Sequence, residues 1–217
     1  ITREGKNVRP HVSVVTNFTK PTDSKPALLT LGEVETFLHE FGHSLHGMFA
    51  NTRFESLSGT NVWWDFVEMP SQFLENYAVE PEFLHTFAFH YKTGEPIPDE
   101  LIERITKSRN FNVAYACLRQ VSFGLLDMAY YTMAHPFTDD IVPFEKHAWK
   151  DAMIIGQLPN TCMTVQVSHI MAGGYAAGYY SYKWAEVLDA DAFGKFQETG
   201  IFNTATARSF RSNILSQ

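Results

Sequence analysis

The sequence is poor in cysteine, in positive charge and in long apolar runs. Only two cysteines, Cys117 and Cys162, occur in 217 residues, which excludes a disulfide-rich secreted scaffold. No apolar run reaches the roughly 18 residues of a membrane-spanning helix, so we expect no membrane partner. Lys and Arg number 17 against 24 Asp and Glu, a net charge of -7. This acidic balance argues against a generic binder of nucleic-acid phosphates.

The composition nevertheless suits a folded chain. Hydrophobic residues make up 45% of the sequence, more than a disordered chain contains, and the length suits one sizeable domain over residues 1–217. The chain begins with Ile1 and shows no signal-peptide pattern, so we expect a piece of a longer protein. Few cysteines fit a reducing compartment, and we expect a cytoplasmic location.

Apolar spacing of three to four residues dominates and predicts a mainly α fold. A β-branched alternation from His11 to Phe18 predicts a short strand near the N-terminus. Helices are expected over 31–50, in part of 66–80, in one or two pieces over 99–133, near 144–155, and through Trp184 and Val187.

The clearest helix is the one expected over 31–50. Thr30 and Glu33 fit a capping box, with the N-cap and the third helical residue bonding each other's backbone. Six apolar residues keep a helical period and predict the packed face of this helix: Val34, Phe37, Leu38, Phe41, Leu45 and Met48. The same rotation count puts His39 and His43 roughly opposite, facing a cleft.

Residues 39–43 read His-Glu-Phe-Gly-His, which matches the H-E-x-x-H pattern. His39 and His43 lie one turn apart, about 40° around the helix, so both imidazoles can hold one metal ion. Glu40 can reach a water on that ion without being a ligand, as a general base must. The alternative is a chance match with incidental histidines.

A catalytic zinc needs a third protein ligand and leaves a fourth position open. His46 lies on the same helical face, but three ligands on one straight helix would spread over about 10 Å, too far for bonds of about 2 Å. Glu68 follows His43 by 25 residues, enough for a second helix to return beside the first. We predict Glu68 as the ligand, and His46 as a residue behind the ligands, a cleft residue or a satisfied polar neighbour.

A tyrosine-rich segment from Ser168 to Tyr182 follows later. Gly173 and Gly174 permit unusual backbone angles and a close approach of peptide substrate. Tyrosine hydroxyls can donate to an oxyanion. The alternative is packing, since three tyrosines recur at helical spacing: Tyr175, Tyr179 and Tyr182.

These motifs together resemble the thimet oligopeptidase and peptidyl-dipeptidase family of gluzincin metallopeptidases. The resemblance is carried by His39 to His43, Phe66 to Gln72, and His169 to Tyr182, in that order, and extends over nearly the whole chain. Ser58-Gly59-Thr60-Asn61 resembles the bacterial peptidyl-dipeptidase branch.

The resemblance implies a catalytic core that binds one Zn²⁺ through His39, His43 and Glu68, with Glu40 as general base. It implies substrate binding and transition-state stabilisation by His169, Tyr175 and Tyr182, and a substrate contact for Tyr179. We predict packing for Tyr180 and Trp184. Short peptides are the implied substrates, cleaved so as to release C-terminal dipeptides.

Members of this family are longer than this chain, so the resemblance implies a missing N-terminal helical lobe and a missing C-terminal end. Three alternatives stay open. The chain could bind zinc without cleaving peptides, it could belong to an endo-acting oligopeptidase, or it could be a helical binding domain with incidental histidines.

Overall fold

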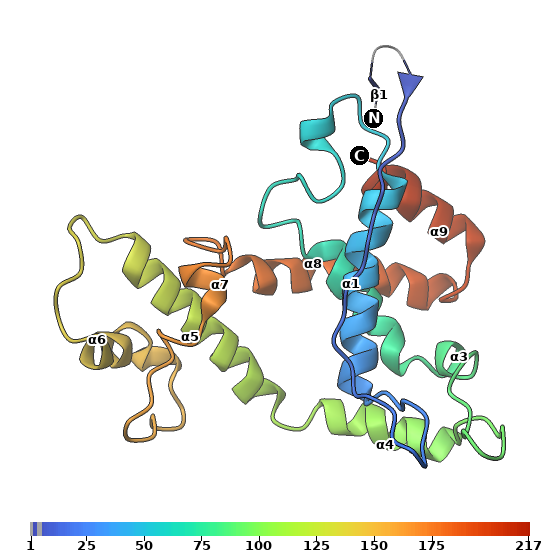
Figure 1. The fold of residues 1–217 in the computed structure, drawn as a ribbon, viewed down its shortest axis with the longest axis horizontal. Helices are drawn as coiled ribbons and strands as arrows, with labels where there is room; N and C mark the ends of the chain where they lie inside the picture. The colour runs from blue at the N-terminus through green and yellow to red at the C-terminus, as the bar shows by residue number, and fades with distance from the viewer. Residues whose placement is uncertain (1, 4–5) are drawn as a thin grey trace. The chain divides into compact units, whose positions relative to one another are not determined.

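A computed structural model gives the fold and describes residues 2–3 and 6–217, with side chains from residue 6 onward (Figure 1). The chain divides into two compact units. Unit 1 comprises residues 1–107 and 185–217, and unit 2 comprises residues 108–184.

Helices make up most of the described chain, which confirms the mainly α prediction. The helices of unit 1 and its borders are α1 (Leu31–Phe49), α2 (Met69–Glu75), α3 (Pro81–Leu84), α4 (Asp99–Arg109), α8 (Ser181–Thr199), α9 (Thr204–Phe210), the short turns η1 (Glu55–Leu57) and η2 (Asn76–Val79), and the π-helical turn η4 (Arg211–Leu215). Those of unit 2 are α5 (Val113–Tyr131), α6 (Ile141–Ala148), α7 (Ser168–Met171) and the short turn η3 (Lys150–Ala152). None of the described helices has both the length and the apolar character needed to cross a membrane.

The short β segment lies near the N-terminus but not where the sequence predicted it. Strands β1 (Thr2–Arg3) and β2 (Lys6–Asn7) pair antiparallel. The predicted strand over 11–18 is wrong, because this segment has no strand pairing. It runs extended beside α1, as Figure 1 shows, and exposes its valines.

Side chains at the two ends of this segment attach it to α1. The guanidinium of Arg9 donates to the backbone carbonyls of Met48 and Ala50, at the C-terminal end of the helix. At the other end, the backbone N–H and hydroxyl of Thr19 both donate to Glu33, each at 2.7 Å. Helix ends leave carbonyl groups without intrahelical partners, and Arg9 supplies donors there.

The N-terminus of α1 is as predicted. The Thr30 hydroxyl accepts from the Glu33 N–H, and the Glu33 carboxylate accepts from the Thr30 N–H, which completes the capping box. These bonds, first that from the Thr30 backbone and then those from Thr19, lower the pKa of Glu33 to about 2.

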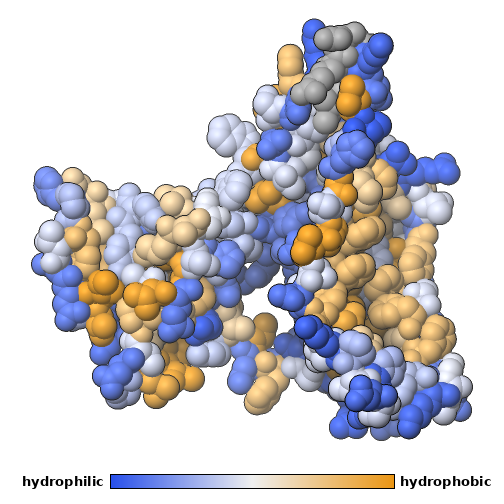
Figure 2. All heavy atoms as spheres, in the orientation of Figure 1, coloured by the Kyte–Doolittle hydropathy of each residue, from blue (hydrophilic) through white to orange (hydrophobic). Residues whose placement is uncertain are grey.

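The packed face of α1 is only partly as predicted. Leu38 is buried and Val34 packs against the same core. Phe37, Phe41 and Met48 are each more than a third exposed, so their predicted burial is wrong. Their positions lie about 60 to 100° around the helix from Leu38, on the flank of the face that α2 covers. Figure 2 shows apolar side chains gathered on this side of unit 1, over α1.

The core of unit 1 is aromatic and joins α1, α2, η2 and α8. Phe73 lies at its centre, with its ring centroid 4.3 Å from that of Phe210 and 5.1 Å from that of Phe196. Such aromatic pairs add roughly 0.5–1.5 kcal/mol each beyond the burial of their area. The buried members are Leu38, Phe73, Tyr77, Ala78, Phe193, Phe196 and Ile201. This core fixes α2 against α1, which positions the site.

The other helix predictions are mixed. The helix expected through Trp184 and Val187 is confirmed by α8, and Pro70 lies in the first turn of α2, where proline is tolerated. The helix expected near 144–155 is α6, which ends at Ala148 and begins earlier than expected, at Ile141, because Asp140 caps it by accepting from the Val142 N–H.

Unit 2 has its own core, built on α5. Its buried members are Phe123, Leu126, Trp149, Val167, Ile170 and Tyr179.

Candidate metal centre

Three predicted ligands meet in unit 1. Nε2 of His39 lies 3.3 Å from Oε2 of Glu68, and Nε2 of His43 lies 3.1 Å from the same oxygen. One ligand atom from each of the three residues lies within 4.8 Å of the others. Four ligands at about 2.1 Å from a tetrahedral zinc are spaced about 3.4 Å apart. The distances of His39 and His43 from Glu68 are close to this spacing, so the three residues fit a tetrahedral ion such as zinc.

Close packing of α1 on α2 brings these residues together. A Cβ placed on Gly42 would lie 2.4 Å from the carbonyl oxygen of Pro70 and 2.5 Å from the Cα of Ser71, distances that no side chain tolerates. Because Gly42 precedes His43 and Pro70 follows Glu68 by two residues, this contact sets how closely the ligands on the two helices approach.

The carboxylate of Glu68 is held in place from its own helix. Glu68 is only 2% exposed. The hydroxyl of Ser71 donates to Oε2 of Glu68 at 2.9 Å and is itself buried. A buried carboxylate is costly unless it is paired and hydrogen-bonded, and here the two histidines and Ser71 supply the partners.

A second carboxylate, Glu75, orients His39. Its Oε1 lies 2.6 Å from Nδ1 of His39, so Nδ1 donates a hydrogen bond to it and Nε2 faces Glu68. Carboxylates behind metal-bound histidines do this in many metal sites. Burial lowers the pKa of His39, but hydrogen bonds and charges from Glu68 and Glu75 outweigh it and raise that pKa to about 10.

Sequence reasoning did not single out Glu75. The usable signal was its spacing: it follows Glu68 by seven residues, two turns along the same face of one helix.

His46 is not one of the grouped ligands. It is 1% exposed, and its ring packs edge-on against Phe66. Within residues 6–217, neither of its ring nitrogens has a hydrogen-bond partner, so the expected satisfied polar neighbour is wrong. Burial, with a smaller effect of His43, lowers its pKa to about 4 and keeps the ring neutral near pH 7.

Glu40 lies between the two histidines on α1 and is partly buried. Its backbone carbonyl accepts from Ser44, whereas its carboxylate forms no hydrogen bond or ion pair with the described part of the chain. Within the described residues, no ion pair therefore competes for the carboxylate of Glu40, which the sequence predicts to be the general base.

The other predicted site residues lie in unit 2 and form an aromatic cluster. The rings of Tyr175 and Tyr182 stack with centroids 4.9 Å apart. The His169 ring lies 5.7 Å from that of Tyr175 and 6.1 Å from that of Tyr182. His169 is exposed and the two tyrosines are partly buried. The structure thus brings these three residues together, as a site requires.

The two glycines of this segment have distinct roles. Gly174 has φ of +89°, a conformation that favours glycine. A Cβ on Gly173 would lie 2.8 Å from the Cα of His169. Gly173 therefore allows the turn after α7 to fold tightly against His169, and both glycines are exposed, as substrate contact requires.

Helix α5 holds this segment through a buried acid that the sequence analysis missed. The carboxylate of Asp127 accepts from the backbone N–H of Ala177 at 2.8 Å and from that of Tyr179 at 2.9 Å. Ala177 has φ of +56°, which is unfavourable for a residue with a side chain, so Asp127 stabilises an otherwise costly turn. An acidic residue in an otherwise apolar helical stretch was the available signal.

Tyr179 differs from its neighbours. Its ring is buried in the core of unit 2, its hydroxyl donates to Gln120 at 2.9 Å, and burial raises its pKa. Its substrate contact stays a prediction. Tyr180 and Trp184 are 51% and 50% exposed, so the packing predicted for them is wrong.

The site combines two histidines one turn apart on α1, a glutamate between them and the carboxylate of Glu68 at the start of α2. This is the composition of a metallopeptidase centre. Residues 2–217 match the model of peptidase family M3, and the chain belongs to this family. It is 43% identical to oligopeptidase A of Escherichia coli over 99% of the chain. Identity is 39% to the dipeptidyl carboxypeptidase of that organism and 35% to saccharolysin of Saccharomyces cerevisiae, each over 96% of the chain.

The matched region covers 32% of oligopeptidase A, 31% of the dipeptidyl carboxypeptidase and 30% of saccharolysin. The chain thus spans about a third of the length of these relatives.

Proposed function

We propose that the protein to which this chain belongs is a zinc-dependent gluzincin-type peptidase that hydrolyses short peptides. The observation that carries the proposal is the convergence of His39, His43 and Glu68 beside an unengaged Glu40, in a chain of peptidase family M3. The names of its relatives, oligopeptidase A and dipeptidyl carboxypeptidase, support peptides as substrates.

His39, His43 and Glu68 would hold the ion. A bound zinc ion supplies Lewis acidity, which polarises a scissile carbonyl and makes water acidic enough to attack near neutral pH. Glu40 accepts the proton of the attacking water and then delivers it to the leaving amine. Glu75 keeps the proton of His39 on Nδ1, so that Nε2 remains available to the ion.

His169, Tyr175 and Tyr182 are proposed to bind substrate and to donate hydrogen bonds to the developing oxyanion. The clustering of their rings supports a shared role, and Gly173 and Gly174 leave the adjacent backbone open to a peptide. Asp127 positions this segment without touching substrate.

The central test is Glu40→Gln in the full-length protein. The variant should keep about one zinc per chain by elemental analysis and lose at least a hundredfold of its turnover of a quenched fluorescent peptide, because it lacks the proton acceptor. Glu82→Gln, an exposed glutamate on α3, is the matched control and should keep full activity. Normal turnover by Glu40→Gln would refute the assigned role.

Release of C-terminal dipeptides was predicted from the resemblance, and it remains our proposal for the cleavage pattern. Mass spectrometry of the products separates dipeptide release from internal cleavage. Dipeptide release should fail on a peptide whose C-terminal carboxylate is blocked, whereas internal cleavage should continue.

Comparing the 217-residue chain with the full-length protein tests whether a missing lobe is required. A cytoplasmic location is likewise proposed, and cell fractionation checks it.

A further inference from the structure

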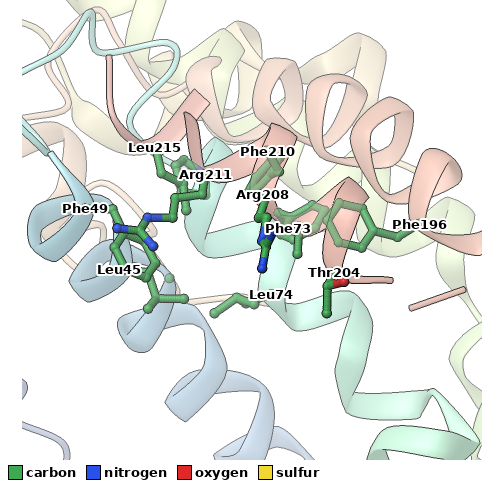
Figure 3. A pocket seen from close by; sticks show the side chains of 13 residues that line it. Leu45, Phe49, Phe73, Leu74, Phe196, Thr204, Arg208, Phe210, Arg211 and Leu215 are labelled. Carbon is green, nitrogen blue, oxygen red and sulfur yellow. The ribbon is translucent and has the colours of Figure 1, made fainter. Parts of the chain in front are cut away.

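A cavity of about 360 Å³ opens in unit 1 and is lined by α1, α2, α8, α9 and η4 (Figure 3). None of the three proposed metal ligands lines it, although Gly42 and Pro70, the contact between α1 and α2, do. It is therefore separate from the site of the proposed hydrolysis.

The cavity wall is almost wholly apolar. Its large apolar side chains are Leu45, Phe49, Phe73, Leu74, Phe196, Phe210 and Leu215. Aromatic and aliphatic lining of this kind is typical of pockets that hold the hydrocarbon part of a small ligand.

Two arginines interrupt this apolar wall. Figure 3 shows Arg208 and Arg211 reaching from α9 and η4 in the direction of α1 and α2. Arg211 lies over the ring of Phe49, 4.5 Å from its centroid. Within residues 6–217, no carboxylate side chain forms an ion pair with either arginine.

A second cavity of about 830 Å³ adjoins the first and shares Phe49, Arg208 and Arg211 with it. It adds Arg9, whose guanidinium donates to two neutral backbone carbonyls, so its charge is not neutralised there. The described residues that line the two cavities include no aspartate or glutamate. Three arginines thus converge in a chain whose net charge is -7, at the border between an apolar and a polar cavity.

We propose that the joined cavities bind a small amphipathic carboxylate. Its apolar body occupies the space among the phenylalanines, and its carboxylate lies against Arg208 and Arg211, with Arg9 adding positive potential. Guanidinium groups match the planar carboxylate with paired hydrogen bonds, and these are stronger beside an apolar wall than in water. A neutral ligand would leave the arginines unpaired.

Isothermal titration of decanoate into the full-length, zinc-loaded protein tests the proposal. We expect binding of one decanoate per chain with Kd below 1 mM, and at least tenfold weaker binding of decanol, which lacks the charge, and of acetate, which lacks the chain. Equal binding of decanol and decanoate would overturn the proposal, because it would show an apolar cavity without anion recognition. Binding of acetate as tight as that of decanoate would also overturn it, since the carboxylate would then be bound elsewhere, for example at the zinc.

Variants locate the site. Arg208→Met and Arg211→Met should each weaken decanoate binding at least fivefold, and Ala207→Trp, which fills the apolar cavity without changing charge, at least tenfold. Arg53→Met is the matched control, since Arg53 also lies over a phenylalanine, 5.5 Å from the ring centroid of Phe54, and lines neither cavity. It should bind decanoate within twofold of the parent.

Unchanged binding by both Arg208→Met and Ala207→Trp refutes the site. Should Arg211→Met fail to fold because Arg211 covers Phe49, Arg208→Met still decides, since the side chain of Arg208 has no hydrogen bond or ion pair within the described residues to lose. Zinc content should be the same in every variant, which separates this site from the metal centre.

Discussion

The carboxylate of Glu75 lies 2.6 Å from Nδ1 of His39, one of the three proposed metal ligands. Replacing it with an amide removes the negative charge that favours one tautomer of His39, and the amide can present its N–H₂ to the same atom. The contribution of this one residue is therefore separable from that of the ligands.

Glu75→Gln should weaken zinc binding about 10- to 100-fold, the usual range for residues behind metal-bound histidines. Competition with a fluorescent zinc chelator measures this affinity, and Glu80→Gln, a glutamate between η2 and α3, is the control. If Glu75→Gln bound zinc as tightly as Glu80→Gln, Glu75 would have no part in positioning His39.

At the same scale, the sequence predicted which side chains meet but not the residues that hold them in place. The H-E-x-x-H pattern and the 25-residue separation predicted that His39, His43 and Glu68 come together, and the structure places them within 4.8 Å of one another. Glu75 and Asp127 were missed because their importance lies in partners 36 and 50 residues or more away in the chain. Such hydrogen bonds depend on how elements pack, and the spacing of residues within one element does not encode that.

Among the elements, α1 and α2 are coupled by the absence of a side chain at Gly42. Gly42→Ala would place a methyl group against the backbone of Pro70 and Ser71, so the helices must separate. We expect a loss of roughly 1–3 kcal/mol in the free energy of unfolding, typical of an overpacked contact, together with weaker zinc binding.

Gly32→Ala is the internal control, because nothing lies within 4 Å of its Cβ and it is in the same helix. It should leave zinc binding unchanged and stabilise the protein by up to about 1 kcal/mol, the difference in helix propensity. Urea unfolding and zinc titration measure both effects. A Gly42→Ala variant as stable as the Gly32→Ala variant would contradict the close contact.

The capping box of α1 predicts a pH effect on stability. The pKa of Glu33 is lowered to about 2 from an ordinary 4.5, so the charged form is favoured in the folded state. Its stabilising contribution is fully present above about pH 4.5, decreases as the pH falls, and is lost below about pH 2. The stability difference between the parent and Glu33→Gln should follow this course.

NMR titration of the Glu33 carboxyl carbon provides the direct measurement, with an expected midpoint near pH 2. In Thr19→Val, which lacks one of the hydroxyl bonds, the midpoint should rise. A midpoint at an ordinary value in the parent would show that the bonds from Thr30 and Thr19 are absent in solution.

Sequence patterns predicted elements well where local chemistry decides them. The capping box placed the start of α1, and its expected end at about residue 50 is one residue from the observed end at Phe49. The strand predicted over 11–18 is wrong because alternation of β-branched residues indicates an extended chain but does not show whether a second strand pairs with it. Here the segment lies along helix α1, to which the flanking residues Arg9 and Thr19 attach it. The exposure of Phe37 and Phe41 was missed because the packed face is set by where α2 crosses at Gly42.

At the scale of the whole molecule, we expect bound metal to stabilise the fold of unit 1. A ligand that binds only the folded state stabilises it by about 2.7 kcal/mol at a free concentration 100 times its Kd. Removing zinc with a chelator should lower the unfolding temperature of the full-length protein and speed hydrogen exchange of the α1 and α2 amides.

Glu68→Gln provides the control for this experiment. Because this variant lacks one of the proposed metal ligands, the chelator should not change the hydrogen exchange of its α1 and α2 amides. Identical exchange in the parent with and without chelator would contradict a metal site at His39, His43 and Glu68.

The extended segment beside α1 has a consequence for its length. About ten residue steps separate Arg9 from Thr19, and a fully extended chain covers roughly 33 Å in that distance. On α1 the anchored positions, Glu33 at one end and Met48 and Ala50 at the other, are 15 to 17 residues apart, which is about 23 to 26 Å along the helix. The segment is therefore longer than the span between its anchors by only about two or three residues. Val14 and Val15 could be exchanged for many residues, whereas deletions beyond this slack would detach an anchor, so insertions here should be tolerated better than deletions.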